Sequence, residues 1–292
     1  FFYGIVRTSD RISRESLTQL LISKINLRNA SALIRSIMDF AKIIGPLIGA
    51  IIYSYYGITQ AYILIAILYL FSFLIIFSID VPGANYHKIN IIKEIKTGIK
   101  YLNKNKVLVS IMFFAGLANL ILFTLPGAYL PFIIKDIING NASDLALFNS
   151  FTAIGALVGS LILSFGNLSN RPGKLVFLFL IIWHFSMFLT SIITNKLLLT
   201  LILVIYGAAG SITMISLAVL VLSITQKDMI GRIIGIRQLA IFTLPVGLVI
   251  SGYLIDTFGI IFSIQSVTII GLIITLTLGY KSKKFMNYKN IN

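Results

Sequence analysis

The chain of 292 residues contains no cysteine, only two histidines and only nine acidic residues. The missing thiols exclude structural disulfides, zinc-thiolate sites and cysteine nucleophiles, and the shortage of histidines and acids disfavours metal catalysis. Charged residues of all kinds make up 11% of the chain, whereas a soluble domain carries about 25%. This shortage excludes an ordinary cytosolic enzyme, because a globule of this size would lack the charged side chains to cover its surface.

Apolar residues take the place of the missing charge, at 58% of the chain and a mean hydropathy of +0.97. A membrane-spanning helix needs about 20 mostly apolar residues to cross the hydrocarbon core. The sequence therefore predicts an all-α membrane protein with about eight spans. They cover residues 36–56, 61–79, 107–134, 145–165, 175–194, 197–222, 239–255 and 260–280.

The positive residues predict the orientation of these spans. All but two of the 24 lysines and arginines fall in connections on one side of the membrane, and the exceptions are Lys135 and Lys196. Positive residues stay in the cytoplasm, so we expect both ends of the chain on the cytoplasmic side. The formal charge of +15 is then a topology signal, and no nucleic-acid partner is expected.

The sequence predicts that the chain divides into four segments. Residues 1–79 are expected to be the remainder of an N-terminal half, residues 107–280 a C-terminal half of six helices, and residues 281–292 a basic cytoplasmic tail. Residues 80–106 between the halves carry apolar residues at helical spacing with lysines on the other faces, which predicts an amphipathic helix at the membrane surface. The apolar opening residues end at Arg7 and lack a start methionine, so we expect an N-terminally truncated chain, a fragment of a longer protein.

An internal repeat and three short motifs link these segments. Two triplets share separations of ten and twelve residues. They are Arg35, Gly45, Gly57 and Arg237, Gly247, Gly259. The motifs are Gly45-Pro46 with Gly49 in a helix, a loop of Gly166, Asn170, Arg171, Gly173 and Lys174, and the segment 226–235 with Gly231-Arg232. With these residues the chain resembles the major facilitator superfamily, whose two halves are parallel repeats.

The resemblance implies a fold and a function. The eight spans resemble helices five to twelve of the twelve in the major facilitator fold. The segment 226–235 is similar to the loop before the eleventh helix in the branch that includes enterobactin exporters and macrolide-efflux proteins. A transporter of this kind exports drug-like or siderophore-like amphipathic solutes by alternating access, with proton coupling and no cofactor. Its partners are the solute, the lipid bilayer and protons, and the abundant Ile, Lys and Asn suggest a bacterial cell membrane. Asn170 replaces the usual aspartate of the family's loop, which implies a weakened conformational latch.

Charged residues on one face of the first span are the strongest candidates for mechanism. Arg35, Asp39 and Lys42 share a helix face, and an unpaired charge deep in the membrane costs at least ~3 kcal/mol. One interpretation is a cytoplasmic gate or coupling cluster. The other is a neutralised helix end whose cations reach the headgroups. Asp39 is the only acid inside a predicted span, so it is the sole candidate for proton coupling.

By resemblance, the third and sixth spans line the substrate cavity. Two sets of residues recur at helical spacing there. They are Asn119 and Phe123 with Gly116 and Gly127, and Tyr206, Thr213 and Met214 with Gly210 and Leu217. Together they predict a mostly apolar wall with a few hydrogen-bonding groups. The alternative is that Asn119 bridges helices and the glycines only allow close packing.

Three further features have both a functional and a structural interpretation. His184 could relay protons, but the resemblance places it on a peripheral helix, so we expect a neutral ring bonded to a neighbouring helix. Gly155 and Gly159 form a GxxxG pair, which predicts helix packing. Pro126, Gly127 and Pro131 predict a kink that either moves or is static.

Two other functions compete with transport. A membrane-embedded enzyme acting on lipid needs a nucleophile, a metal site or a pair of acids at membrane depth, and the chain offers only Asp39 and His184 there. An inactive gene fragment is the other alternative, because half of the cavity wall is expected to be missing.

Overall fold

The computed structural model describes residues 91–165, 171–226 and 229–288 continuously, together with residues 37, 40–41, 44–45, 48–49, 51–53 and 55–77. The chain divides into two compact units, Phe1–Lys88 and Ile89–Asn292. Every regular element in the described ranges is a helix, which confirms the all-α prediction. The boundary between the units falls inside the expected linker.

The first unit contains one complete described helix, α3 (Ile58–Ile76). It is apolar on every side, and none of its residues is buried within the protein. A helix that is hydrophobic all round has to face lipid or other helices. Its composition and length therefore suit a membrane span rather than the surface of a soluble domain.

The second unit begins with a surface helix and an interrupted span. The surface helix is α4 (Ile91–Lys104). The span begins as α5 (Lys106–Leu117) and continues without a loop through short π-helical and α-helical segments to Ile137. These segments are η1 (Ala118–Leu122), η2 (Leu125–Tyr129), α6 (Leu130–Phe132) and η3 (Ile133–Ile137).

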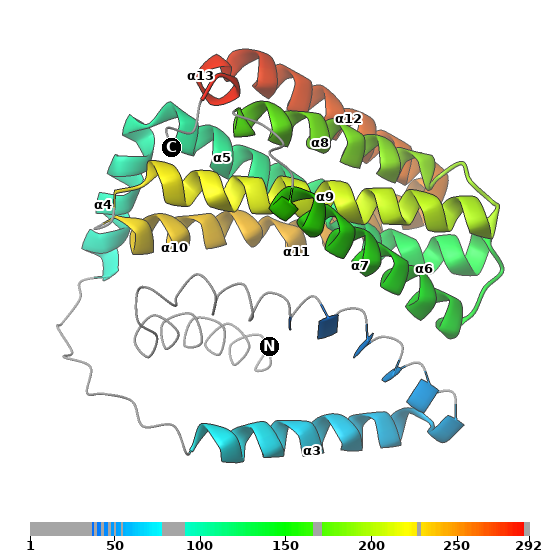
Figure 1. The fold of residues 1–292 in the computed structure, drawn as a ribbon. Coiled ribbons are helices and arrows are strands. Elements are labelled where there is room, and N and C mark those ends of the chain that lie inside the picture. The colour runs from blue at the N-terminus through cyan, green and yellow to red at the C-terminus, as the bar shows by residue number, and fades with distance from the viewer. Residues whose placement is uncertain are drawn as a thin grey trace. The chain divides into compact units, whose positions relative to one another are not determined.

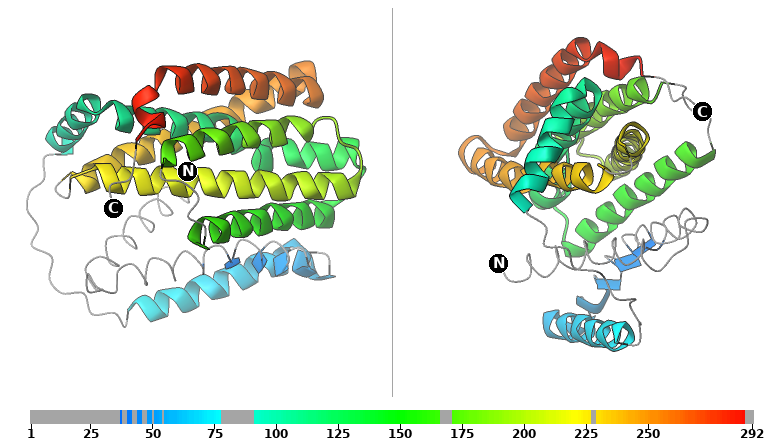
Figure 2. Two further views of the ribbon diagram at one scale, coloured as in Figure 1. Left: turned by 45° about the horizontal axis from the view of Figure 1, so that its top comes forward. Right: turned by 90° about the vertical axis from the view of Figure 1, so that its left-hand side faces the viewer.

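All but one of the remaining helices of the second unit pack against this span, and the exception, α7, packs on α9 (Figures 1 and 2). Helix α9 runs through the middle of the unit and contacts α7 and α8 extensively. The short α13 turns back onto α5 and α8. The helices are α7 (Ala142–Phe165), α8 (Pro172–Leu189), α9 (Lys196–Ile224), α10 (Ile230–Ile241), α11 (Thr243–Phe258), α12 (Ile260–Lys281) and α13 (Lys283–Met286).

Seven spans in the described residues are long and apolar enough to cross a membrane, and six of them lie in the second unit. The expected span at residues 36–56 lies largely outside the described residues and is helical where it is described. The expected start at residue 239 was wrong, because the span runs from Ile230 to Phe258 as α10 and α11. Arg232 and Arg237 lower the hydropathy of this stretch, but they do not interrupt the helical backbone.

Small residues bring α7 and α9 into direct backbone contact. A side chain at Gly155 would overlap the carbonyl group of Val204, and one at Gly159 would overlap the backbone of Ala208. From the other helix, a side chain at Gly207 would overlap the carbonyl oxygen of Thr152. The GxxxG pair is therefore a helix-packing device, as predicted.

The last members of the two repeated triplets share their backbone geometry. Gly57 and Gly259 have φ values of +86° and +80°, and they are the only glycines with positive φ in the described ranges. The amide of Gly57 donates to the carbonyl of Tyr53 at 3.1 Å, and the amide of Gly259 donates to that of Ile255 at 2.9 Å. Each glycine thus closes one helix and opens the next with a single residue, in a conformation that side chains disfavour.

Candidate functional site

The most irregular part of the second unit is the interrupted span between Ala118 and Ile137. It holds three π-helical segments, and such segments are frequent at functional sites. Pro126 and Pro131 have no amide hydrogen, so the carbonyl groups of Leu122 and Gly127 lose their usual donors four residues later. The span therefore departs from regular α-helical hydrogen bonding around the two prolines that predict a kink.

A side chain from α9 satisfies one of these carbonyl groups. The hydroxyl of Tyr206 donates a hydrogen bond to the carbonyl oxygen of Leu122. Tyr206 is 3% exposed, so neither group has water as an alternative partner. A buried acceptor left without a donor is costly, and this bond therefore ties α9 to the span at the place where proline breaks its hydrogen-bond ladder.

Three aromatic side chains pack around this bond. The ring of Trp183 on α8 lies edge-on to Phe123, with centroids 5.0 Å apart, and edge-on to Tyr206 at 5.6 Å. Gly210 makes room for the indole, because a Cβ atom there would lie 2.7 Å from it. We call Phe123, Trp183 and Tyr206 the aromatic cluster. It joins α8 and α9 to the interrupted span, where Phe123 directly follows η1.

Asn119 and its expected companions do not share one face. The buried amide of Asn119 donates to the carbonyl oxygen of Ala115 in its own span at 2.8 Å, not to another helix. Gly116 lies against α10 and α11, and its carbonyl accepts the Thr243 hydroxyl at 2.8 Å. Phe123 contacts α8 instead. The expectation of a common face was wrong, because π-helical turns change the angle between successive residues.

On α9 the expected cavity residues below Tyr206 are enclosed by protein. Thr213 is fully buried, and its hydroxyl has no hydrogen-bond partner among the residues that the structure describes. Met214 is half-buried against the core, and Leu217 is buried. The face of α9 that starts at Tyr206 therefore carries an unsatisfied hydroxyl next to apolar side chains.

His184 on α8 is also enclosed, at 1% exposure. Its Nδ1 atom lies 2.8 Å from the carbonyl oxygen of Leu180, which only accepts, so Nδ1 carries the proton and Nε2 is an acceptor in the neutral ring. A Cβ atom at Gly271 would lie 2.7 Å from Nε2. The expected bond to a neighbouring helix was wrong, because Nδ1 bonds within α8 and Nε2 has no hydrogen-bond partner among the described residues.

The buried polar residues of this region are uncharged or weakly basic. Within the described ranges they are Asn, Ser, Thr and His, with no Asp, Glu, Lys or Arg among them. The same residues contain no group of three or more His, Asp or Glu side chains that could hold a metal ion. Chemically, the described part of this region can donate and accept hydrogen bonds through its Asn, Ser, Thr and His side chains.

The gate cluster lies where the structure gives no description. Arg35, Asp39 and Lys42 all fall outside the described residues, as does Pro46. Their roles therefore remain predictions. Gly45 and Gly49 of the helix signature lie in helical backbone.

The loop motif is described only in its second half. Gly166 and Asn170 lie outside the described residues, whereas Arg171 directly precedes α8. Gly173 in the first turn of α8 lies so close to the carbonyl group of Phe285 that no side chain would fit. Lys174 is exposed. In this half the motif therefore positions α13 against α8.

Helix α4 is docked on α10, a contact that sequence reasoning missed. Glu94 forms an ion pair with Arg232, and a Cβ atom at Gly98 would lie 2.9 Å from Ile236. The hydroxyl of Tyr101 accepts the amide of Gln226 at 3.1 Å. The hydrogen bond from Arg232 holds the pKa of Glu94 below its ordinary value, while burial acts in the opposite direction.

The segment 226–235 is not the expected loop. Helix α10 begins at Ile230, so Gly231, Arg232 and Gly235 are helical. The resemblance suggested a loop here, but the neighbours of the glycines continue the helix and Arg232 is held by Glu94. The signal for this contact was Gly98, a small residue in the middle of an otherwise bulky amphipathic stretch.

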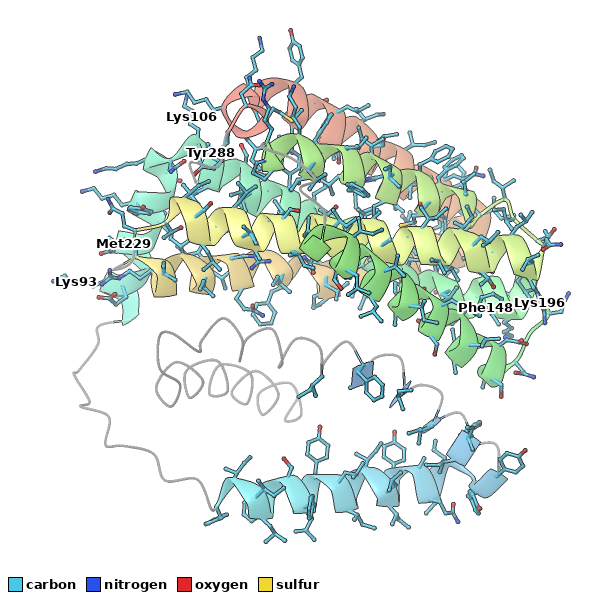
Figure 3. The ribbon with its side chains drawn as sticks, in the orientation of Figure 1. Lys93, Lys106, Phe148, Lys196, Met229 and Tyr288 are labelled. Atoms are coloured by element: carbon cyan, nitrogen blue, oxygen red, sulfur yellow. The ribbon has the colours of Figure 1, made fainter. Side chains whose placement is uncertain are left out.

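Lysines mark the two ends of the second unit. Figure 3 shows Lys93 and Lys106 at one end and Lys196 at the other. At that other end the Nζ atom of Lys196 lies 3.5 Å from Oδ1 of Asp144. The ends of α12 and the short α13 add Lys281, Lys283 and Lys284 near Lys106. We call the end with Lys106 the lysine-rich end.

Comparison with known proteins supplies the family. The model of the Major Facilitator Superfamily matches residues 21–249, which is more than half of the chain. A search of curated proteins found no match.

Proposed function

Because the chain belongs to the Major Facilitator Superfamily and is therefore a transmembrane transporter, we propose that it exports drug-like or siderophore-like amphipathic solutes by alternating access. The observation that carries this proposal is the interrupted span 106–137, which has two prolines and three π-helical segments. A span with weakened backbone bonding bends at lower cost than a regular helix. The halves of such a transporter rock about a central site, and a span that bends easily supports this movement where it borders the site.

The buried polar groups favour a particular class of solute. Asn119, Thr213 and Tyr206 offer hydrogen bonds, and the aromatic cluster offers large apolar surfaces. The buried polar side chains of the described residues include no Asp, Glu, Lys or Arg, and the one buried histidine is His184. A bulky solute with scattered hydrogen-bonding groups matches this surface better than a phosphate or carboxylate, which requires a positive partner. We place Asn119, Phe123, Tyr206, Thr213 and Met214 along the solute path in one of the alternating states.

Proton coupling is assigned to Asp39. It is the only acid within the predicted spans, and Arg35 and Lys42 on the same predicted face can hold its charge or release it when the proton binds. In this scheme the lysine-rich end of the protein faces the cytoplasm, because positive residues remain inside. Entry of a proton from the opposite side then drives the solute outward.

Transport is tested with the purified chain in liposomes that carry an imposed pH gradient. We expect the chain to move a fluorescent amphipathic dye, and the movement to stop when a protonophore dissipates the gradient. Asp39→Asn should abolish the gradient-driven movement, and Asn119→Ala should reduce it. Thr257→Ala, at an exposed position of α11, is the control that should transport normally.

Two results would overturn the proposal. If the chain moves no dye although it is correctly inserted, the export function is wrong. If Asp39→Asn moves dye as fast as the unaltered chain, the coupling role of Asp39 is wrong. Mass spectrometry of the recovered dye separates transport from catalysis, because a transporter returns the solute chemically unchanged.

A further inference from the structure

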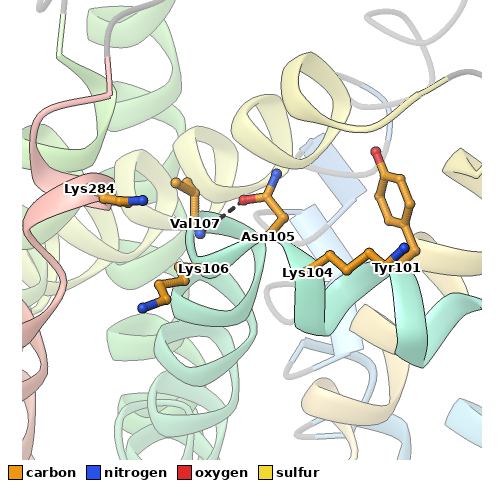
Figure 4. Close-up of a pocket in the computed structure, with 6 residues that line it drawn as sticks. All are labelled: Tyr101, Lys104, Asn105, Lys106, Val107 and Lys284. Atoms are coloured by element: carbon orange, nitrogen blue, oxygen red, sulfur yellow. Dashed lines mark hydrogen bonds between the residues drawn. The ribbon is translucent and has the colours of Figure 1, made fainter.

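Two cavities open at the lysine-rich end of the second unit, with volumes of about 400 and 730 Å³. Lys106 and Lys284 line both, so the cavities adjoin. Figure 4 shows the smaller cavity, which these two lysines line together with Tyr101 and Lys104 from α4. Together the two cavities form one basic corner between the start of α5 and the turn from α12 to α13.

The backbone around this corner is firmly held. Phe285 of α13 is fully buried, and its ring lies 5.2 Å from that of Phe114. Gly173 lets the carbonyl group of Phe285 approach α8 closely. The hydroxyl of Ser110 donates to that of Ser282 at 3.0 Å, which fastens α5 to the end of α12. The lysines of the corner are therefore attached to a fixed frame.

The positive charges of the lysines in this corner are not balanced by nearby acidic side chains in the described ranges. No carboxylate in the described ranges pairs with its lysines. The first turn of α5 holds no acid either, and this helix end is capped by Asn105, whose side chain accepts the amide of Val107 at 3.0 Å. A helix amino end carries a partial positive charge. The five lysines that line the corner are Lys104, Lys106, Lys281, Lys283 and Lys284.

The surroundings select the kind of anion. Ser110, Ser282 and Tyr280 place hydroxyl groups in the wall, and hydroxyls and ammonium groups together suit phosphate oxygens. Tyr280 is 77% exposed at the end of an apolar span, where tyrosines mark the membrane surface. Below it the outer face of α12 exposes Ile273 and Leu276, so acyl chains have an apolar surface to lie on.

We propose that the basic corner binds the phosphate group of an anionic phospholipid, with the acyl chains of the lipid along α12. Basic pockets between membrane helices on the cytoplasmic side bind anionic headgroups in this manner. The bound lipid would neutralise the lysines and join α4, α5, α12 and α13 at one point. The proposal concerns a structural lipid and does not depend on the identity of the transported solute.

Native mass spectrometry of the detergent-purified chain tests this proposal. The probes are phosphatidylglycerol, phosphatidylcholine with the same acyl chains, and inorganic phosphate. We expect retention of phosphatidylglycerol over phosphatidylcholine, with a roughly tenfold or greater loss of affinity in the variant Lys106→Gln/Lys284→Gln. The matched control is Lys96→Gln/Lys100→Gln, which removes the same charge from exposed positions of α4 and should bind normally.

Each other outcome overturns the proposal. Equal retention of both lipids means that headgroup charge is not recognised, and equal losses in the two double variants mean that only net charge matters. If millimolar inorganic phosphate displaces phosphatidylglycerol fully, the site belongs to a soluble anion. Thermal unfolding without lipid checks that both double variants are folded. If Lys106→Gln/Lys284→Gln unfolds at a lower temperature than the unaltered chain, the single variant Lys284→Gln is used in its place.

Discussion

Tyr206 donates its hydroxyl hydrogen to the carbonyl oxygen of Leu122, the acceptor that Pro126 leaves without its usual backbone donor. The two residues lie 84 positions apart and belong to different helices. The bond shows how a proline inside a membrane span is tolerated, since a neighbouring helix replaces the missing donor.

Removal of this hydroxyl should destabilise the second unit. We expect Tyr206→Phe to lower stability by about 1–2 kcal/mol, because the Leu122 carbonyl is left buried without a donor. Thermal unfolding in detergent measures the loss. Trp183 is the single tryptophan and packs on Tyr206, so its fluorescence reports on the same place. Tyr253→Phe on the exposed face of α11 removes the same atom and should have no effect.

A second variant isolates the role of Pro126. Pro126→Ala restores a backbone amide four residues after Leu122, so the tyrosine hydroxyl becomes dispensable. We expect Tyr206→Phe to cost much less in a Pro126→Ala background than in the unaltered chain. Strictly additive losses in this double-mutant cycle would show that the two residues act independently.

Close packing of α7 on α9 predicts that the effect of a glycine-to-alanine substitution on stability depends strongly on its position. Gly155→Ala should destabilise the protein by about 1–3 kcal/mol, because the new methyl group meets the backbone of Val204. Gly252→Ala on α11 meets open space, and it should leave stability unchanged or raise it by up to about 1 kcal/mol. Paired thermal unfolding curves compare the two variants, and similar curves would contradict the packing of α7 on α9.

The ion pair between Glu94 and Arg232 predicts that acid releases α4. Its hydrogen bond lowers the pKa of Glu94 from the ordinary 4.5, so the stabilisation is complete above that value and is lost as the pH falls through the lowered one. A spin label on Lys100→Cys should therefore gain mobility at low pH. Glu94→Gln should make the label mobile at every pH, and an immobile label in that variant would disprove the role of the pair.

The absence of cysteine makes the orientation directly testable. Lys284 lies in α13, just beyond the last residue of α12, and Thr257 lies near the end of α11 that precedes the first residue of α12. Single cysteines at these two positions therefore lie at opposite ends of α12. We expect an impermeant thiol reagent to label Lys284→Cys only from the cytoplasm and Thr257→Cys only from outside. The reverse labelling pattern would invert the topology and place the basic corner in the outer leaflet.

Much of the fold could be predicted from composition, because lipid imposes a minimum length of apolar helix. The spans near Ala142, Pro172, Lys196 and Ile260 were placed to within a few residues. The span at Ile230 was misplaced because hydropathy falls at arginines whether or not the helix continues. Gly155 and Gly159 could be identified because their four-residue spacing is local.

The candidate site was less predictable, since its bonds join distant parts of the chain. The presence of Tyr206 at helical spacing suggested a cavity wall, but not a bond to Leu122. The signal was Pro126, which identifies an orphaned carbonyl without naming its partner. The pairing of Glu94 with Arg232 spans 138 positions, and the anchoring of α13 by Phe285 depends on three-dimensional packing that no periodicity records.

The single-residue joint at Gly259 restricts how α11 and α12 can move relative to each other. Gly259 is the only residue between α11 and α12. The adjoining ends of the two helices are therefore held at a fixed short distance. Any separation between them has to grow with distance from that joint and is greatest at the lysine-rich end. A solute could therefore pass between these two helices only near the lysine-rich end, where they can separate, and not near Gly259, where they are joined.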